Sequence, residues 1–311
     1  MRALRCTSLD GPDGIELADV PEPDGDGVLI DVHAAGVSYP DLLITRGQYQ
    51  AKLDPPFVPG SEVAGTVVAG EGFDAGDRVA ALTFAGGFAE RAVAPSLFTF
   101  ALPEALSFAQ GAALVMNYHT AYFCLVTRGR LRAGETVLVH GAAGGVGTAT
   151  LQVAKALNAH TLAVVSSDEK ERVAGEAGAD EVLRSDGEWP RRAADVVIDP
   201  VGGERFVDSL RALAAGGRLV VVGFTGGAIP EVKVNRLLLN NTEVVGAAWG
   251  AYAAADPEAE RQIGEQINAM AERGDVKPIV GARLPLERGA DALRLLADRA
   301  ALGKVVLDVR P

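Results

Sequence analysis

The chain has 311 residues, of which 48% are hydrophobic and 23% are charged, and its formal net charge at pH 7 is −12. This composition is typical of a soluble globular protein with about two domains. The net negative charge argues against nucleic acid and against an anionic membrane surface as partners. No apolar run reaches transmembrane length, the first residues do not read as a signal peptide, and the two cysteines are isolated, so we expect a cytoplasmic protein.

The first part of the chain, to about residue 117, is rich in short strand candidates separated by glycine and proline. Apolar or alternating runs predict strands at residues 28–34, 62–68, 78–82 and 88–92. Residues 40–46 are consistent with one short helix among them. We therefore expect a small, partly antiparallel β barrel in this region rather than alternating strands and helices.

From about residue 118 onward, strand and helix candidates alternate along the chain. Short apolar runs predict strands at residues 136–140, 161–165, 181–183, 195–198, 218–222 and 243–246. This alternation predicts an α/β fold with a doubly wound parallel sheet, whose ligands lie at the carboxyl ends of the strands. The residues that follow each strand are therefore candidates for a binding site.

The last part of the chain changes pattern again after Gly250. It predicts an amphipathic helix, a strand, a second helix and a final strand at residues 257–273, 279–282, 287–299 and 304–309. We expect this tail to return to the first domain. Residues 1–119 and 251–311 then form one β-rich domain, and residues 120–250 form a dinucleotide-binding domain. The alternative is that the tail extends the parallel sheet.

The most informative stretch is the glycine-rich turn in Val-Leu-Val-His-Gly-Ala-Ala-Gly-Gly-Val-Gly, residues 137–147. A buried strand leads into the turn, and a helical pattern follows from Val146. Such a unit can bind a pyrophosphate, because the helix N-terminus presents free N–H groups and the glycines let the backbone approach. Gly144 and Gly147 match the last two glycines of Gly-x-Gly-x-x-Gly, but Ala142 holds the first place. An ordinary strand-to-helix turn is the alternative.

The second predicted strand of this unit ends without the acidic residue that NAD-dependent enzymes place on the ribose 2′-hydroxyl. Ser166 and Ser167 offer hydroxyl donors there, and Lys170 lies one turn further on. Small donors and a cation suit a 2′-phosphate, so we expect NADPH rather than NADH. The alternative is that Ser167 or Asp168 only caps the next helix. Asp168 and Glu169 would also repel a phosphate if they pointed inward.

The sequence does not predict a metal site. The histidines show no ligand spacing, and no Cys-x-x-Cys pair is present. We therefore expect a structural role for each histidine. The four are His33, His119, His140 and His160.

The order and spacing of several short segments together form a distinctive pattern. The segments are Ala-Gly-Val-Ser-Tyr-Pro-Asp at 35–41, Pro-Gly-Ser-Glu-Val-Ala-Gly at 59–65, Gly-Asp-Arg-Val at 76–79, Thr-Ala-Tyr at 120–122, Gly-Glu-Ala-Gly-Ala-Asp at 175–180, Gly-Gly-Arg at 216–218 and Gly-Lys-Val-Val at 303–306. With the glycine turn, the chain resembles the medium-chain dehydrogenase/reductase superfamily, in particular its zinc-free quinone oxidoreductase (zeta-crystallin-like) branch. The resemblance implies a GroES-like catalytic domain split around a Rossmann domain.

The resemblance also bears on the chemistry. Zinc-dependent relatives carry Cys at the position of Ser38 and His at that of Ser61, so no zinc is expected here. Without this Lewis acid, alcohol oxidation is disfavoured, and NADPH-dependent hydride transfer to a quinone is the implied activity. One alternative is reduction of an activated C=C bond in an enone or alkenal. Another is a non-catalytic dinucleotide-binding protein.

Candidate site residues follow from the strand ends and from the resemblance. Tyr49 and Ser38 are the catalytic candidates, and Tyr49 would lie near the nicotinamide as a proton or hydrogen-bond donor, unless it is only a wall residue. The cofactor-binding candidates are Tyr49, Thr120, Ala143, Gly144, Gly145, Val146, Ser166, Ser167, Lys170, Ser185, Gly203, Val222, Gly223, Phe224, Ala248, Trp249 and Gly250. Relatives pair across the last strand of the parallel sheet, which implies a homodimer through residues 243–246.

Overall fold

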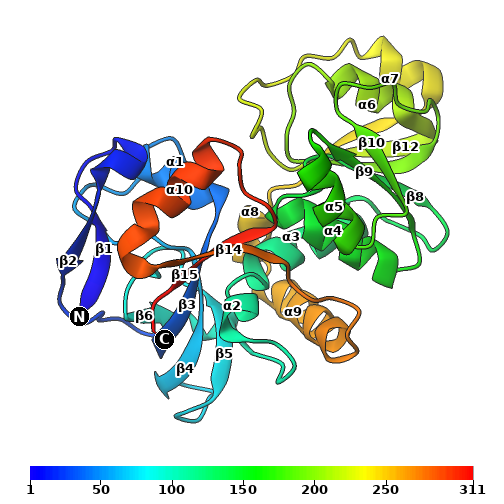
Figure 1. Cartoon of the computed structure of the whole chain (residues 1–311). Helices are drawn as coiled ribbons and strands as arrows, with labels where there is room; N and C mark the ends of the chain where they lie inside the picture. Colours follow the sequence, from blue (N-terminus) through cyan, green and yellow to red (C-terminus); the bar gives the residue numbers. More distant parts are fainter. Residues whose placement is uncertain (311) are drawn as a thin grey trace. The chain divides into compact units, whose positions relative to one another are not determined.

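The structure, a computed structural model, describes residues 1–310, which divide into two units with separate sheets (Figure 1). The first unit contains residues 1–116 and 277–310, and the second contains residues 117–276. A mixed β sheet dominates the first unit, and a parallel sheet flanked by helices dominates the second. The predicted α/β class, with a doubly wound sheet inserted in a β-rich domain, is confirmed.

The sheet of the first unit is built from strands at both ends of the chain. The strands are β3 (Val28–Val37), β4 (Glu62–Ala69), β5 (Arg78–Leu82), β6 (Arg91–Ala94), β7 (Thr99–Ala101), β14 (Val280–Pro285) and β15 (Lys304–Asp308). Their order is β14-β15-β3-β4-β5-β7, with β6 paired to β3. β15 runs antiparallel beside β3, with Val305 opposite Val37, so the tail completes this sheet and does not extend the parallel one.

An antiparallel hairpin of β1 (Arg2–Cys6) and β2 (Ile15–Asp19), which the sequence pattern does not predict, precedes this sheet. The backbone N–H of Leu4 in β1 donates to the carbonyl of Phe88 at 2.8 Å, and Ala3 forms a bridge with Ala89. Residues 88 and 89 thus pair with β1 rather than with β3. The strand predicted at residues 88–92 therefore begins only at Arg91, as β6.

Three helices and three short 3₁₀ turns complete the first unit. They are α1 (Tyr39–Thr45), α2 (Phe108–Gly111), α10 (Gly289–Ala297), η1 (Gly11–Gly14), η2 (Ser96–Phe98) and η5 (Leu286–Arg288). α1 and α10 lie in contact (Figure 1). A Cβ atom at Gly289 would come within 2.0 Å of Leu4 Cδ1, so glycine allows the start of α10 to approach the hairpin.

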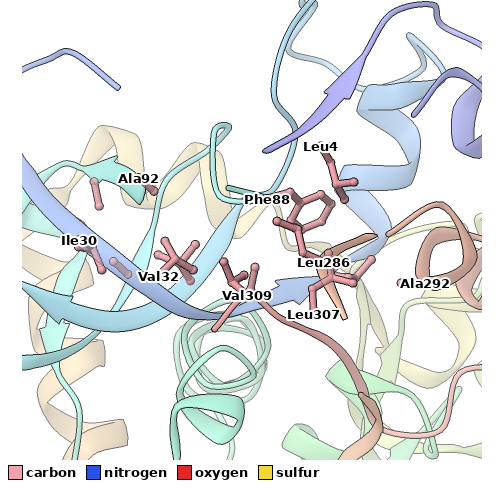
Figure 2. Packing of buried hydrophobic residues seen from close by; sticks show 14 of the residues in the cluster. Leu4, Ile30, Val32, Phe88, Ala92, Leu286, Ala292, Leu307 and Val309 are labelled. Carbon is pink, nitrogen blue, oxygen red and sulfur yellow. The ribbon is translucent and has the colours of Figure 1, made fainter. Parts of the chain in front are cut away.

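Apolar side chains from the sheet, the hairpin and α10 form the core of the first unit. Figure 2 shows this cluster, in which the labelled side chains are Leu4, Ile30, Val32, Phe88, Ala92, Leu286, Ala292, Leu307 and Val309. All of them are buried. The cluster joins residues from both ends of the chain, and burial of this apolar surface is the main force that holds the tail to the first unit.

The sheet of the second unit is parallel throughout. Its strands are β8 (Thr136–Val139), β9 (His160–Val165), β10 (Glu181–Arg184), β11 (Ala194–Asp199), β12 (Leu213–Val221) and β13 (Glu243–Gly246). Their order is β10-β9-β8-β11-β12-β13. The chain runs outward from β8 to β10 on one side and returns to β11 on the other. The carboxyl ends of β8 and β11 therefore form the switch point at which such sheets bind ligands.

The chain that precedes, connects and follows the strands of the parallel sheet forms helices. They are α3 (Thr120–Tyr122), α4 (Gly145–Ala156), α5 (Asp168–Glu176), α6 (Phe206–Ala212), α7 (Asn235–Asn240), α8 (Trp249–Ala255) and α9 (Pro257–Glu272), with π-helical turns η3 (Val115–His119) and η4 (Phe123–Arg128). In Figure 1, α4 and α5 lie beside β9, and α6 and α7 contact β12. None of the helices within residues 1–310 combines the length and hydrophobicity that a membrane crossing requires.

Helices α8 and α9 belong to the second unit, whereas the expected division assigned residues 251–276 to the first. One face of α9 buries Ile263, Ile267 and Met270, as its amphipathic pattern predicts. Glu260 on the same helix bonds to His119, which fixes α9 in the second unit. The sequence pattern predicts that this helix has an apolar face, but it does not identify the unit that covers the face.

Candidate functional site

The glycine turn connects β8 to α4 as the sequence predicts. Gly144 is the N-cap of α4 and provides no side-chain cap, and the first turn of the helix carries no acidic residue. The twelve-residue helix therefore presents uncapped N–H groups and the positive end of its dipole at the switch point of the sheet. Both properties favour an anion at this position.

The glycines in this turn have different roles. A Cβ atom at Gly147 would lie 2.2 Å from the Gly141 carbonyl oxygen and 2.6 Å from Ala142 Cα, so Gly147 allows α4 to pack closely against the turn. At Gly144, a Cβ would lie tightly against the Gly141 oxygen at 3.3 Å, and no other non-neighbouring atom of residues 1–310 comes within 4 Å, so the rest of this face of the turn is open. Together they fit a bound pyrophosphate, which needs close packing of the helix and an unobstructed backbone.

The end of β9 combines a helix cap with a cation. Ser167 is the N-cap of α5, and its hydroxyl accepts a hydrogen bond from the Lys170 backbone N–H at 3.3 Å. The Lys170 ammonium donates to the Ser166 hydroxyl at 3.2 Å. The capping role expected as the alternative is therefore present, and it coexists with a cation that reaches the strand end.

Arg184, at the carboxyl end of β10, supplies a second cation that the sequence analysis missed. Its guanidinium donates to the Ser166 carbonyl at 3.2 Å and to the Asp168 carboxylate at 2.8 Å. Asp168 is thus paired with an arginine, and its side chain is 99% exposed. The two cations Lys170 and Arg184 converge on Ser166, which suits a 2′-phosphate. The strand predicted at residues 181–183 stopped one residue short of this arginine.

Two further predicted residues, Ser185 and Gly203, follow β10 and β11. The backbone N–H of Ser185 donates to the Val165 carbonyl at 2.8 Å, and its carbonyl accepts a bond from Arg205. The Arg205 guanidinium also stacks over the Trp189 ring at 4.0 Å. At Gly203, which has a φ of 75°, no atom lies within 4 Å of where a Cβ would be.

The remaining predicted residues of the second unit lie in α3 and after β12 and β13. Thr120 in α3 is buried, whereas Phe224 after β12 is partly exposed. Val222 is held by a bond from its N–H to the Asp199 carbonyl at 2.9 Å. The Trp249 side chain is buried, and its indole N–H donates to Glu260 at 2.7 Å. Gly223, Ala248 and Gly250 complete these loops.

In the first unit, Ser38 belongs to a buried polar cluster at the start of α1. Its backbone N–H donates to Asp41 Oδ2 at 2.8 Å, and the Ser61 hydroxyl donates to Asp41 Oδ1 at 2.5 Å. Burial raises the pKa of Asp41 to about 6, against the opposing effect of these two hydrogen bonds. Asp41 therefore organises the Ser38 backbone and is itself enclosed.

Lys304 and Glu62 complete this cluster and were not assigned a role from the sequence. The Lys304 ammonium donates to Ser38 Oγ and to Glu62 Oε2, both at 2.7 Å. Glu62 Oε1 accepts from the Met116 backbone N–H at 2.9 Å. Each is the first residue of its strand and is followed by apolar residues, and a charge beside such a run is the one sequence signal that points to them.

Tyr49 lies in the loop that follows α1 and is half-buried. Burial raises the pKa of the Tyr49 phenol above its usual value, and the charge of Asp41 adds to this shift. The phenol is therefore protonated at neutral pH and can donate a hydrogen bond. Tyr49 and Ser38, the two catalytic candidates, both belong to the first unit.

Within residues 1–310, no cluster of three or more His, Cys, Asp or Glu side chains could hold a metal ion. Each histidine has a neighbour that accounts for its position. The contacts are His33 stacked on Phe108 at 4.2 Å, His119 bonded to Glu260 at 2.5 Å, His140 bonded to Ser209 at 2.8 Å and the exposed His160 bonded to Glu181 at 3.2 Å.

Two protein-family models match the chain. The model of the alcohol dehydrogenase GroES-like domain matches residues 24–104, and the model named zinc-binding dehydrogenase matches residues 145–267. The first match lies in the β-rich unit and the second in the unit that contains the parallel sheet. The matches agree with the division of the fold into a β-rich part and a Rossmann part.

Similar proteins cover nearly the whole chain. Quinone oxidoreductase of Rattus norvegicus is 36% identical, with 99% of this chain and 97% of the relative covered. The quinone oxidoreductase of Thermus thermophilus, solved alone and in complex with NADPH, is 36% identical with a TM-score of 0.84, covering 99% of this chain and 100% of that one. A probable oxidoreductase from Mycobacterium abscessus is 42% identical with a TM-score of 0.90, covering 99% of both chains.

Proposed function

Because the chain belongs to the quinone oxidoreductase family of the medium-chain dehydrogenase/reductase superfamily, we propose that it reduces a quinone with NADPH. In this reaction the quinone would gain one hydride, which is two electrons and one proton, from the cofactor and a second proton from solvent. The products are the oxidised cofactor and a hydroquinone. The observation that carries the proposal is the open glycine turn on α4 together with the two cations at Ser166.

Bound NADPH would supply the hydride, and residues of the second unit would hold it. Ala143, Gly144, Gly145 and Val146 would receive the pyrophosphate at the start of α4. The 2′-phosphate would be bound by Ser166, Lys170 and Arg184. The neighbouring residues Ser167, Ser185 and Gly203 would line the same end of the cofactor. Thr120 and the loops 222–224 and 248–250 would border the nicotinamide. Because the Trp249 side chain is buried, we expect its backbone to make the contact.

In the first unit, Ser38 and Tyr49 would act on the acceptor. Both carry hydroxyl groups that can donate a hydrogen bond to a carbonyl oxygen, where negative charge develops as the hydride arrives. Tyr49 holds its proton at neutral pH, as an ordinary phenol does, and burial raises the pKa of this phenol further. A quinone needs no metal for this activation, since it is already electrophilic.

The residues at the positions of the zinc ligands in zinc-dependent relatives do not fit a zinc ion. They are two serine hydroxyls, of Ser38 and Ser61, rather than a thiolate and an imidazole. The Lys304 ammonium, 2.7 Å from Ser38 Oγ, would repel a divalent cation at this place. No step of the proposed reaction therefore uses a metal.

The proposed activity is tested by turnover with two classes of acceptor. Purified protein is expected to oxidise NADPH when naphthoquinone is added and to oxidise it much more slowly with cyclohexenone. The product also reports on the mechanism, because one-electron reduction would release quinone radicals and hydride transfer would not. Turnover of cyclohexenone alone would make the protein an enone reductase, and tight NADPH binding without any turnover would make it a binding protein.

The choice of NADPH over NADH depends on Arg184 and Lys170. Arg184→Ala is expected to raise the KM for NADPH by about 10- to 100-fold, because a charge-assisted hydrogen bond to the 2′-phosphate is lost. The KM for NADH, which lacks this phosphate, should change little. The matched control is Arg172→Ala on α5, which removes an exposed arginine paired with Glu176. Equal losses with both cofactors would contradict the assignment.

We also propose a homodimer that forms through β13. This strand is the last in the order of the parallel sheet, so one of its edges is open, and Val244 is exposed. Leu238 and Leu239, just before this strand, are each 76% exposed. Light scattering should give the mass of a dimer for the wild-type protein and of a monomer for Val244→Lys. Leu17→Lys, which changes an exposed leucine in the first unit, is the control and should stay dimeric.

The cytoplasm is our proposed location. Cys6 and Cys124 are both free thiols buried in the structure, which suits a reducing compartment. Burial raises the pKa of both thiols, to about 12 for Cys124, so neither is a reactive thiolate at neutral pH.

A further inference from the structure

A buried ammonium group lies beside the catalytic candidate Ser38. Lys304 is 3% exposed and Glu62 is fully buried, and their side chains form an ion pair at 2.7 Å. A Cβ atom at Gly36 would lie 2.7 Å from Lys304 Cε and 2.9 Å from Glu62 Oε2. The neighbouring strand therefore leaves space for this pair, which is part of the fold rather than a contact between mobile surface groups.

The direction of the hydrogen bonds decides where the Ser38 proton points. An ammonium group can only donate, so Ser38 Oγ accepts the bond from Lys304 and its own proton needs another acceptor. Each oxygen of the two nearby carboxylates accepts a hydrogen bond from a donor other than the Ser38 hydroxyl. Glu62 accepts from Lys304 and from the Met116 N–H, and Asp41 accepts from the Ser61 hydroxyl and the Ser38 N–H. Within residues 1–310, no hydrogen bond from the Ser38 hydroxyl is present.

We infer that Lys304, held in place by Glu62, is a positioning residue that fixes the Ser38 hydroxyl as a hydrogen-bond donor to the carbonyl oxygen of the acceptor. The inference rests on the proposed reduction of a carbonyl-bearing acceptor. The positive charge next to Oγ makes the O–H group a stronger donor, and its effect grows as negative charge develops on the acceptor oxygen. Glu62 neutralises the ammonium, so the pair orients the serine without adding net charge to the cluster.

The same pair is poorly explained by stability alone. Removing two charges from water is costly, and an uncharged pair of similar volume often stabilises a protein as well or better. Removing only one partner would leave a buried unpaired charge and could prevent folding. The informative variant therefore replaces both residues together, as Glu62→Gln with Lys304→Met. The glutamine keeps an oxygen for the Met116 N–H, and the methionine keeps the length of the lysine side chain.

The experiment is a cycle of variants assayed with NADPH and naphthoquinone. Ser38→Ala is expected to lower kcat by about 100-fold, as the loss of a donor to a developing oxyanion does elsewhere. The double variant Glu62→Gln with Lys304→Met, here called the neutral pair, is expected to lower kcat roughly tenfold while the KM for NADPH stays unchanged. In the Ser38→Ala background, the neutral pair should have no further effect on kcat, because the group on which Lys304 acts is gone.

A binding measurement provides a readout without turnover. Alpha-tetralone, an aromatic ketone that keeps one carbonyl oxygen, should bind about fivefold more weakly to Ser38→Ala and to the neutral pair than to the wild type. Thr45→Val is the control, since it removes a buried hydroxyl of α1 that bonds only within the helix. This variant should keep the wild-type affinity for the ketone and the wild-type kcat.

Two outcomes would overturn the inference alone, and a third would overturn the proposed function as well. If the neutral pair lowers kcat equally with and without Ser38, the pair acts independently of the serine. If the neutral pair leaves both kcat and ketone binding unchanged, it does not position the donor. If the wild type turns over neither naphthoquinone nor cyclohexenone, the proposed function itself fails, and the inference about its acceptor fails with it.

Discussion

Gly147→Val is expected to abolish NADPH binding and to lower the free energy of unfolding of the second unit by about 3 kcal/mol. A side chain at this position would collide with the Gly141 carbonyl oxygen, since even a Cβ atom would lie 2.2 Å from it. To relieve the clash, α4 must move away from the glycine turn, and its N–H groups then no longer face the pyrophosphate. Urea unfolding and a fluorescence titration with NADPH measure the two effects.

The matched control is a glycine at which an added side chain would not collide with any other atom. Gly175 lies on α5, and no atom is within 4 Å of where its Cβ would be. Gly175→Ala should leave NADPH binding unchanged and raise the free energy of unfolding by roughly 0.5–1 kcal/mol, because alanine is the better helix former. Wild-type affinity for NADPH in Gly147→Val would show that the close approach of α4 is not required.

Glu260→Ala is the second substitution with a large expected effect, a loss of about 3–5 kcal/mol in the free energy of unfolding. Glu260 is fully buried, and its two oxygens engage the His119 ring at 2.5 Å and the Trp249 indole at 2.7 Å. Alanine would leave both of these buried groups without their acceptor and would open a cavity under α9. Denaturant unfolding followed by tryptophan fluorescence measures the loss.

Substitution of an exposed glutamate on the same helix is the control, because it removes one negative charge without disturbing the buried contacts of Glu260. Glu265 pairs with Arg261 at the surface of α9. Glu265→Ala should change the free energy of unfolding by less than about 0.5 kcal/mol, as for most exposed ion pairs. A loss in Glu260→Ala no greater than that in Glu265→Ala would mean that the buried cluster does not hold α8 and α9 to the second unit.

The parallel sheet and its glycine turn could be predicted because their signals are local. Each strand from β8 to β13 is a short apolar run, and the turn has its glycines within a few residues of the helix that they allow to approach. A cap at Ser167 or Asp168 could be offered as the alternative for the same reason, since a cap depends on the next three residues, and the structure places it at Ser167. The hairpin β1–β2 has no such signal, because β2 is mostly not buried.

The parts that were missed depend on contacts between distant residues. Lys304 and Glu62 are 242 positions apart, and they meet only because β15, β3 and β4 are neighbours in one sheet. Arg184 reaches Ser166 across two adjacent parallel strands. The buried position of the Trp249 side chain depends on Glu260, one helix further on. In each case the sequence shows the residue type but not its partner.

The place of β15 in the sheet bears on the order in which the protein can fold during synthesis. The second unit is continuous in sequence, so it can fold as soon as residue 276 has left the ribosome. Most of the first unit is made before the second, but this unit has to wait for its last strand, because β3 pairs with β15 and Val37 lies opposite Val305. Until β15 emerges, β6 covers one edge of β3 only at residues 28–31, and residues 34–37 of that edge have no partner. A nascent chain stalled before β15 would therefore expose the unpaired end of β3, in a part of the first unit that is made before the second unit.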